Sequence, residues 1–187
     1  AYHLRLRRYV VVKKIKDEVA ARINARAEAD ILKRIKHTYL PQVYDFLEID
    51  GGVYTVIDFI EGQSLDYYIK QGYRIQQKQI ILWARQLCEA LVYLHGLVPP
   101  IIHSDIKPQN IMITPQGNVC LIDFNISLDG QGSSQISGMS AGYAPPEQYL
   151  NASPPPQGNA TGASYSFQMA APLDARSDIY SLGATLY

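Results

Sequence analysis

The sequence has little cysteine, no surplus of charge of either sign and no long apolar run. Its 187 residues include 2 cysteines, and 17 Lys and Arg residues balance 17 Asp and Glu residues. Balanced charge gives no electrostatic reason to expect a nucleic-acid or membrane-surface partner. No apolar stretch reaches the ~20 residues of a membrane span, and none follows the basic start Ala1–Arg8 as a signal peptide requires.

Both cysteines, Cys88 and Cys120, lie in apolar stretches. We therefore expect buried, reduced thiols in a cytoplasmic protein, with a disulfide between them as the less favoured alternative. Both ends of the chain interrupt regular patterns, a strand-like run after Ala1 and a helix-like run ending at Tyr187. We expect a fragment of a longer protein, whose other parts are free to anchor it to a membrane.

The first third of the sequence has mainly strand patterns. Arg8–Ile15 is β-branched and predicts a buried strand with a cationic end. Two further strands are predicted over Val43–Ile49 and Val53–Ile60, joined by a turn at residues 50–52. Between the first of these three strands and the other two, apolar residues at helical spacing predict an amphipathic helix with Glu28 beside its stripe. The stripe consists of Ala20, Ile23, Ala27, Ile31 and Ile35.

Helical patterns dominate after Gly62. Ser64 is a candidate N-cap, and His95 and Gly96 mark a helix end. Two segments rich in Gly, Ser or Pro, Leu128–Ser140 and Asn151–Pro172, predict a mobile loop and a flexible insertion. The predicted elements are helices over Leu65–Gln71 and Ile80–Leu94, strands over Ile111–Ile113 and Val119–Ile122, and a helix over Asp174–Tyr187.

The most specific pattern is His103–Asn110, with the sequence HSDIKPQN. It resembles the catalytic loop of Ser/Thr-type protein kinases, H-R-D-L-x-x-x-N, and has Lys107 two residues after Asp105. Phosphoryl transfer needs a carboxylate near the attacking hydroxyl, a cation near the transferred phosphate and an oxygen ligand for Mg²⁺. The resemblance implies these roles for Asp105, Lys107 and Asn110 in that order. Alone, the pattern also fits a polar turn between a helix and a hairpin.

Companion motifs of the same family follow in the expected order. Val10–Lys13 (VVVK) resembles V-A-I-K, residues 123–125 (DFN) resemble D-F-G, and residues 145–147 (PPE) resemble A-P-E. The segment Tyr54–Gly62 resembles the strand and hinge between the two lobes of a kinase. Together these motifs extend the resemblance over nearly the whole chain and weaken the alternative of a simple polar turn.

The resemblance also implies which residues bind ATP and Mg²⁺. Lys13, rather than its neighbour Lys14, is expected to hold the α- and β-phosphates and to pair with Glu28. Asp123 and Asn110 are the expected metal ligands.

At the hinge, Ile57 is expected to flank the adenine pocket, and the backbones of Asp58 and Ile60 to bond the adenine edge. Asp178 is expected to hold the backbone of the catalytic loop. For His103 we favour packing over catalysis, because it is one of four residues at positions of the apolar spine of kinases. The four are Leu32, Val43, His103 and Phe124.

The implied fold is an α+β, two-lobed protein-kinase-like fold, truncated at both ends. Residues 1–61 are expected to form a partial N-terminal lobe with the nucleotide-binding strands, and residues 62–187 a partial C-terminal lobe. The phrases at Gly142–Tyr149 (GYAPPEQY) and Arg176–Tyr187 (RSDIYSLGATLY) are most like those of bacterial kinases.

The sequence departs from the family pattern in four places. Ser104 replaces the arginine of H-R-D, so we do not expect activation through a phosphate–arginine contact there. Asn125 replaces the glycine of D-F-G, and Pro145 replaces the alanine of A-P-E. No G-x-G-x-x-G precedes Lys13, so the fragment alone is expected to be poorly stable and weakly active or inactive.

The leading function is therefore a protein serine/threonine kinase that uses ATP and Mg²⁺ and acts on protein substrates. The alternative is a pseudokinase, a nucleotide-binding or scaffold module without turnover, which Ser104 and Asn125 motivate. A small-molecule phosphotransferase of the same fold is a third reading. The segment Gly142–Glu147, which resembles a peptide-docking segment, favours a protein substrate.

Overall fold

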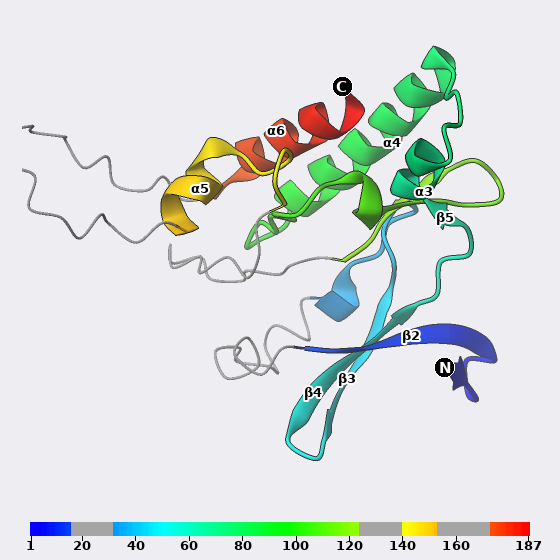
Figure 1. Ribbon diagram of the computed structural model, residues 1–187. Helices are drawn as coiled ribbons and strands as arrows, with labels where there is room; N and C mark the ends of the chain where they lie inside the picture. Colours follow the sequence, from blue (N-terminus) through cyan, green and yellow to red (C-terminus); the bar gives the residue numbers. More distant parts are fainter. Residues whose placement is uncertain (16–31, 124–139, 153–172) are drawn as a thin grey trace, which may run out of the picture.

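The computed structural model describes residues 1–15, 32–123, 140–152 and 173–187. The described elements form a sheet-rich part, which carries the N-terminus, and a helical part, which carries the C-terminus (Figure 1). Several expectations lie outside the described residues. They are the helical stripe up to Ile31 with Glu28, the residues Phe124 and Asn125, the loop up to residue 139 and the insertion after Ala152.

An antiparallel sheet of four strands forms the first part, in the order β1-β2-β4-β3. The strands are β1 (Tyr2–His3), β2 (Arg8–Lys14), β3 (Val43–Ile49) and β4 (Gly52–Asp58). The β3–β4 hairpin turns at Asp50 and Gly51, whose φ angles of 49° and 75° suit a two-residue turn between twisted strands. Both predicted strands are confirmed, although β4 begins at Gly52 and ends at Asp58 rather than at Ile60.

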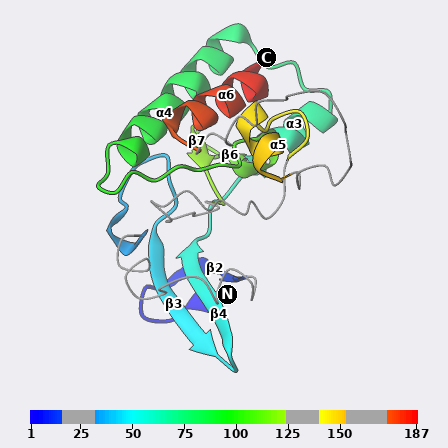
Figure 2. The ribbon, with the colours of Figure 1, turned by 90° about the vertical axis from the view of Figure 1, so that its left-hand side faces the viewer.

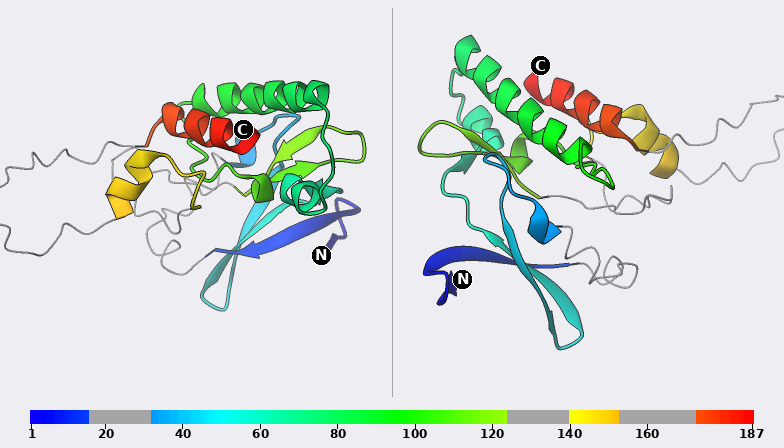
Figure 3. Two further views of the ribbon diagram at one scale, coloured as in Figure 1. Left: turned by 45° about the horizontal axis from the view of Figure 1, so that its top comes forward. Right: turned by 180° about the vertical axis from the view of Figure 1, so that it is seen from behind.

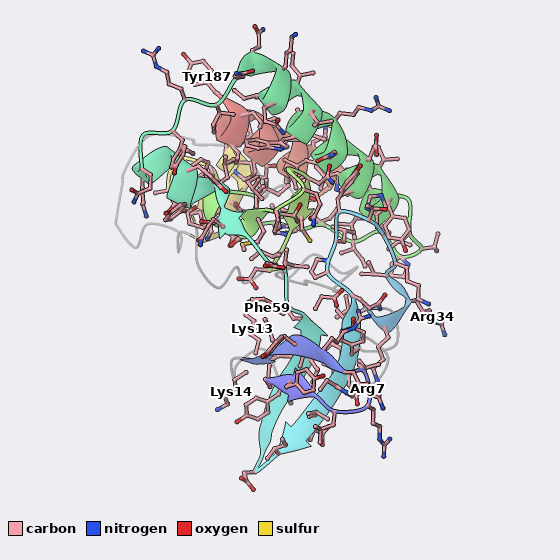
Figure 4. The ribbon with its side chains drawn as sticks, turned by 90° about the vertical axis from the view of Figure 1, so that its right-hand side faces the viewer. Arg7, Lys13, Lys14, Arg34, Phe59 and Tyr187 are labelled. Atoms are coloured by element: carbon pink, nitrogen blue, oxygen red, sulfur yellow. The ribbon has the colours of Figure 1, made fainter. Side chains whose placement is uncertain are left out.

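The prediction that β2 is buried was wrong. Within β2 only Val10 is buried, while Val11 and Val12 are 37% and 44% exposed. β-Branched composition reports how well a residue suits a pleated strand, and it does not report whether a second layer covers the strand. Lys13 and Lys14 point to opposite faces, as alternation along a strand requires, with Lys13 nearer the helical part (Figure 4).

The helical part begins directly after the sheet. Ser64 caps its first helix by accepting a hydrogen bond from the Tyr67 amide, as predicted. The long helix ends at His95 with Gly96 as its C-cap, also as predicted. The elements are β5 (Gln63–Ser64), α3 (Leu65–Lys70), α4 (Gln77–His95), η1 (Pro108–Asn110), β6 (Ile111–Ile113), β7 (Val119–Leu121), α5 (Pro146–Ala152) and α6 (Ala175–Leu186).

Helices α4 and α6 run side by side, and the β6–β7 hairpin lies against them (Figures 2 and 3). The apolar stripe of α4 supplies much of the core, with Leu87, Leu91 and Leu94 almost fully buried. Three side chains of α4 anchor the hairpin, and Gln79 Nε2 is one of them, donating to the Gly117 carbonyl at 3.2 Å. Trp83 Nε1 donates to the Gly117 carbonyl at 2.8 Å, and the buried Gln86 bonds the Asn118 side chain and the Val119 amide.

The two cysteines differ in burial. Cys120 on β7 is buried, as expected, and burial raises the pKa of its thiol to about 12. Cys88 is exposed, so the expectation of a buried thiol was wrong for this residue. It follows Leu87 on α4, and one residue along a helix turns the side chain by about 100° away from the core-facing stripe. None of the helices in the described ranges is long and apolar enough to cross a membrane.

Candidate active site

The loop between α4 and β6 is held from beneath by one buried carboxylate. Asp178 on α6 is fully buried and accepts hydrogen bonds from the backbone amides of His103, at 2.9 Å, and Ser104, at 2.8 Å. His95 Nε2 also lies 2.8 Å from Asp178 Oδ2. The prediction that Asp178 holds the backbone of this loop is confirmed. Hydrogen bonds to an ionised carboxylate are among the stronger ones, so this contact fixes the loop on the helical core.

The side chains of Asp105, Lys107 and Asn110 meet above that anchor. Asn110 Nδ2 donates to Asp105 Oδ2 at 2.9 Å and to the Asp105 carbonyl at 2.8 Å. Lys107 Nζ lies 2.8 Å from the same Oδ2 atom. The structure therefore brings together the three residues that the sequence singled out as catalytic. The asparagine amide orients the carboxylate, and the ammonium group lies beside it.

Ser140 completes this cluster, and the sequence analysis missed that role. Its Oγ donates to Asp105 Oδ1 at 2.7 Å and accepts from Lys107 Nζ at 2.7 Å. The Ser140 hydroxyl thus bridges the Asp105 carboxylate and the Lys107 ammonium group. The signal in the sequence was weak, because Ser140 ends a Gly/Ser-rich run with several serines.

His103 is a packing residue whose ring also makes polar contacts. It is fully buried, and burial lowers the pKa of its imidazole. Its Nδ1 accepts from the Asp105 amide at 3.3 Å, and its Nε2 lies 3.0 Å from the Ile122 carbonyl. Because a carbonyl only accepts, Nε2 carries the proton of a neutral ring. The expectation of packing for His103 is confirmed, and its ring links the loop to the residue before Asp123.

Lys13 and Asp123 join the sheet to the helical part. Lys13 Nζ lies 2.8 Å from Asp123 Oδ1, and both side chains are partly exposed. Lys14 is paired in register with Tyr54, on the other face of the sheet (Figure 4). This geometry supports Lys13 over Lys14 as the phosphate-binding lysine. The expected partner of Lys13, Glu28, lies outside the described residues.

A magnesium ion would find suitable ligands at Asp123 and Asn110. The Asn110 amide nitrogen is used by Asp105, which leaves its side-chain oxygen as the free donor atom. The Ile122 amide bonds the Asn110 carbonyl at 2.8 Å, so the segments that carry the two residues are adjacent. Within the described ranges no group of three or more His, Cys, Asp or Glu residues is placed to hold a metal ion. Two oxygen ligands fit Mg²⁺, which commonly keeps waters and takes its remaining ligands from substrate phosphates.

At the hinge, the Asp58 side chain belongs to a polar network on the face of the sheet opposite to Lys13. Its carboxylate accepts from the Tyr44 hydroxyl and the Gln42 amide, and Arg8 lies 3.7 Å away. Burial and the Asp58 carboxylate raise the pKa of Tyr44. The Asp58 amide donates to the Gln42 carbonyl at 3.0 Å. Because the Asp58 amide is used in this way, its carbonyl oxygen is the group expected to contact adenine. Ile57, the residue before it, pairs with Val11 in the sheet.

A pocket of about 480 Å³ lies beside the hinge. It is bordered by the loop Lys36–Gln42, by Asp58 and Ile60, and by the turn around Asn118. None of the proposed catalytic or phosphate-binding side chains lines it. Asp58 and Ile60, the expected adenine contacts of the hinge, line this pocket.

Comparison with known proteins decides the family. A family model described as "Protein kinase domain" matches residues 1–187. The chain belongs to the protein kinase family. The α+β kinase fold expected from the sequence is thereby confirmed, with the small antiparallel sheet and the helical part described above.

Named relatives of this kinase domain are serine/threonine kinases. It is 30% identical over its whole length to serine/threonine-protein kinase tousled-like 2 of Mus musculus, and covers 27% of that protein. It is 31% identical over 88% of its length to tousled-like 1 of Caenorhabditis elegans, covering 17% of that protein. A probable serine/threonine-protein kinase of Clostridium acetobutylicum is 33% identical over 97% of the chain, which covers 26% of it. The kinase domain thus spans about a quarter or less of these relatives.

Proposed function

We propose that this kinase domain transfers the γ-phosphate of ATP to serine or threonine hydroxyls of protein substrates. The observation that carries the proposal is the cluster in which Lys107 and Asn110 both contact the Asp105 carboxylate. It offers a carboxylate to orient and deprotonate an attacking hydroxyl and an ammonium group to neutralise charge on the transferred phosphoryl group. Positioning and electrostatic stabilisation of this kind supply most of the catalysis in phosphoryl transfer.

The remaining residues have supporting roles in this proposal. Lys13 holds the α- and β-phosphates, and Glu28 steadies that lysine. Ile57 flanks adenine, while the Asp58 carbonyl and the Ile60 backbone bond its edge. Asp123, with Asn110, binds Mg²⁺, which when bound neutralises phosphate charge. Residues 1–61 form part of the N-terminal lobe and residues 62–187 part of the C-terminal lobe.

The proposal extends to partners and location. The partners are ATP and proteins with Ser or Thr acceptors, and the balanced charge argues against nucleic acid. The location is cytoplasmic. The cluster of Asp105, Lys107 and Asn110 and the pair of Lys13 and Asp123 argue against the pseudokinase alternative.

The experiment uses the full-length protein, because this stretch has no G-x-G-x-x-G loop to cover the phosphates. The protein is incubated with Mg²⁺ and γ-labelled ATP together with a mixture of serine-, threonine- and tyrosine-containing peptides. We expect label on serine or threonine. Tight Mg-ATP binding without any transfer would favour the pseudokinase, and transfer mainly to a small molecule would favour the third reading.

A further inference from the structure

Gln148 is a buried residue of α5 whose side chain reaches the catalytic loop. It is 2% exposed, and its Nε2 donates to the carbonyl oxygen of Ser104 at 2.7 Å. Helix α5 (Pro146–Ala152) begins within Gly142–Glu147, the segment that resembles the peptide-docking segment of kinases. A side chain from that region therefore bonds the peptide group immediately before Asp105.

Ser104 has a backbone conformation that needs such support. Its φ is 65°, in the left-handed region that residues other than glycine seldom adopt. Strained residues of this kind persist where their surroundings hold them. Its side-chain oxygen is buried and has no hydrogen-bond partner in the part of the chain that the structure describes. The supports for Ser104 are therefore backbone contacts, the Asp178 carboxylate on its amide and Gln148 on its carbonyl.

We propose that Gln148 is a positioning residue that holds Ser104 at positive φ and thereby sets the direction of the Asp105 carboxylate. Asp178 of α6 accepts a hydrogen bond from the Ser104 amide, and Gln148 of α5 donates one to the Ser104 carbonyl. The proposal rests on the proposed function, because it concerns the same catalytic loop. It also concerns regulation of the catalytic loop, because an uncharged amide connects α5 to this loop without a phosphate group.

This arrangement compensates for the missing arginine of the family motif. An arginine at position 104 ties the loop to the following segment through a phosphate in those kinases that carry one, as the resemblance implies. Here the contact between Gln148 and Ser104 connects the same two regions through the backbone. The tie is present whenever α5 is folded against the loop.

A variant with a matched control tests this role in the full-length protein. Gln148→Met keeps the size and removes the amide donor. Gln109→Met removes another glutamine Nε2 contact of 2.7 Å, to Asp66, at an exposed position of the same loop. We expect Gln148→Met to lower kcat about ten-fold, the equivalent of about 1.4 kcal/mol, with the KM for ATP unchanged. Gln109→Met should leave both unchanged.

Ser104→Gly separates positioning from packing. Glycine adopts a φ of 65° without strain, so in a Ser104→Gly background the loss of Gln148 should cost little kcat. If Gln148 only fills space, its replacement costs the same in both backgrounds, and that result overturns the proposal. If Gln148→Met folds only together with Ser104→Gly, the proposal is supported, whereas unfolding in both backgrounds shows a packing role and overturns it.

Amide hydrogen exchange gives a readout that does not depend on turnover. In Gln148→Met the amides of residues 104–106 should exchange about ten-fold faster, the effect of a local opening made about 1.4 kcal/mol easier, while those of α4 are unaffected. Unchanged exchange together with unchanged kcat overturns the positioning role. If the unaltered protein transfers no phosphate, the proposed function fails, and the exchange result still decides the role of Gln148.

Discussion

Lys13 and Asp123, which are 110 residues apart in the sequence, form an ion pair of 2.8 Å between the sheet and the helical part. The proposed function assigns each of them to ATP, the lysine to phosphates and the carboxylate to Mg²⁺. Both side chains remain partly exposed, so nucleotide can replace the pair without a large desolvation cost.

Lys13→Met should impair catalysis and leave stability almost unchanged. The pair is solvent-exposed, and such pairs contribute about 0–1 kcal/mol to stability. Loss of a positioned cation at the phosphates should lower kcat/KM about 100-fold. Steady-state kinetics with Mg-ATP measure this, and Lys14→Met is the control because Lys14 lies on the other face of β2. Equal losses in the two variants would contradict the assignment of Lys13.

Ser140 should be needed for its hydroxyl and not as a phosphate acceptor. Ser140→Ala removes the contacts to Asp105 and Lys107, and we expect kcat to fall about ten-fold, since a hydrogen bond to a charged group contributes about 1.5–3 kcal/mol. Ser140→Thr keeps the hydroxyl and should retain most of the activity. Ser140→Glu places a second negative charge at Asp105 and should be inactive. An active glutamate variant would show that Ser140 is instead a site of activating phosphorylation.

His103 should make the folded protein sensitive to acid. Burial lowers its pKa below the unfolded value of about 6.5. Below about pH 6.5 the unfolded chain binds a proton that the folded protein refuses, so stability is complete above that pH and falls as the pH drops. Protonation of Nδ1 would also break the contact with the Asp105 amide.

The free energy of unfolding, measured in urea between pH 7.5 and pH 5, checks this expectation. His103→Phe should be less stable at pH 7.5 because it loses two hydrogen bonds, yet its stability should change less with pH. The difference in slope has an upper limit of about 1.4 kcal/mol per pH unit for one proton. Identical slopes would mean that His103 is not the group that titrates.

Gly62, at the junction of the two parts, should tolerate no side chain. Its φ is 134°, and a Cβ atom there would lie 2.0 Å from the Ile113 carbonyl oxygen. We expect Gly62→Ala to cost about 3 kcal/mol, from backbone strain together with overpacking. Gly72→Ala is the control, because Gly72 also has positive φ, but a Cβ atom there would meet nothing within 4 Å in the described part of the chain beyond its own neighbours. It should cost about 1 kcal/mol in the same urea unfolding measurement.

Much of the fold was predictable because local patterns and tertiary packing agree. The cap at Ser64 predicted the start of α3. The apolar spacing and the glycine after His95 predicted α4 and its end. The solvent exposure of β2 and of Cys88 was not predictable in the same way. Exposure depends on which elements pack against a residue, and neither composition nor β-branching reports that.

For the site, spacing within one short loop was informative, and contacts over long sequence distances were not. Asp105, Lys107 and Asn110 converge because a tight loop leaves their side chains few directions. Asp178 was found through its motif. Ser140 and Gln148 reach the loop from a different segment, so no spacing within the sequence indicated their contacts.

Asp105→Asn in the full-length protein tests the central claim most directly. The amide keeps the size of the carboxylate but cannot accept a proton from the attacking hydroxyl. We expect unchanged Mg-ATP affinity and a rate of phosphate transfer in a single turnover lower by about 100-fold or more. Equal transfer by the variant and the unaltered protein would contradict the assignment of Asp105 as the catalytic base.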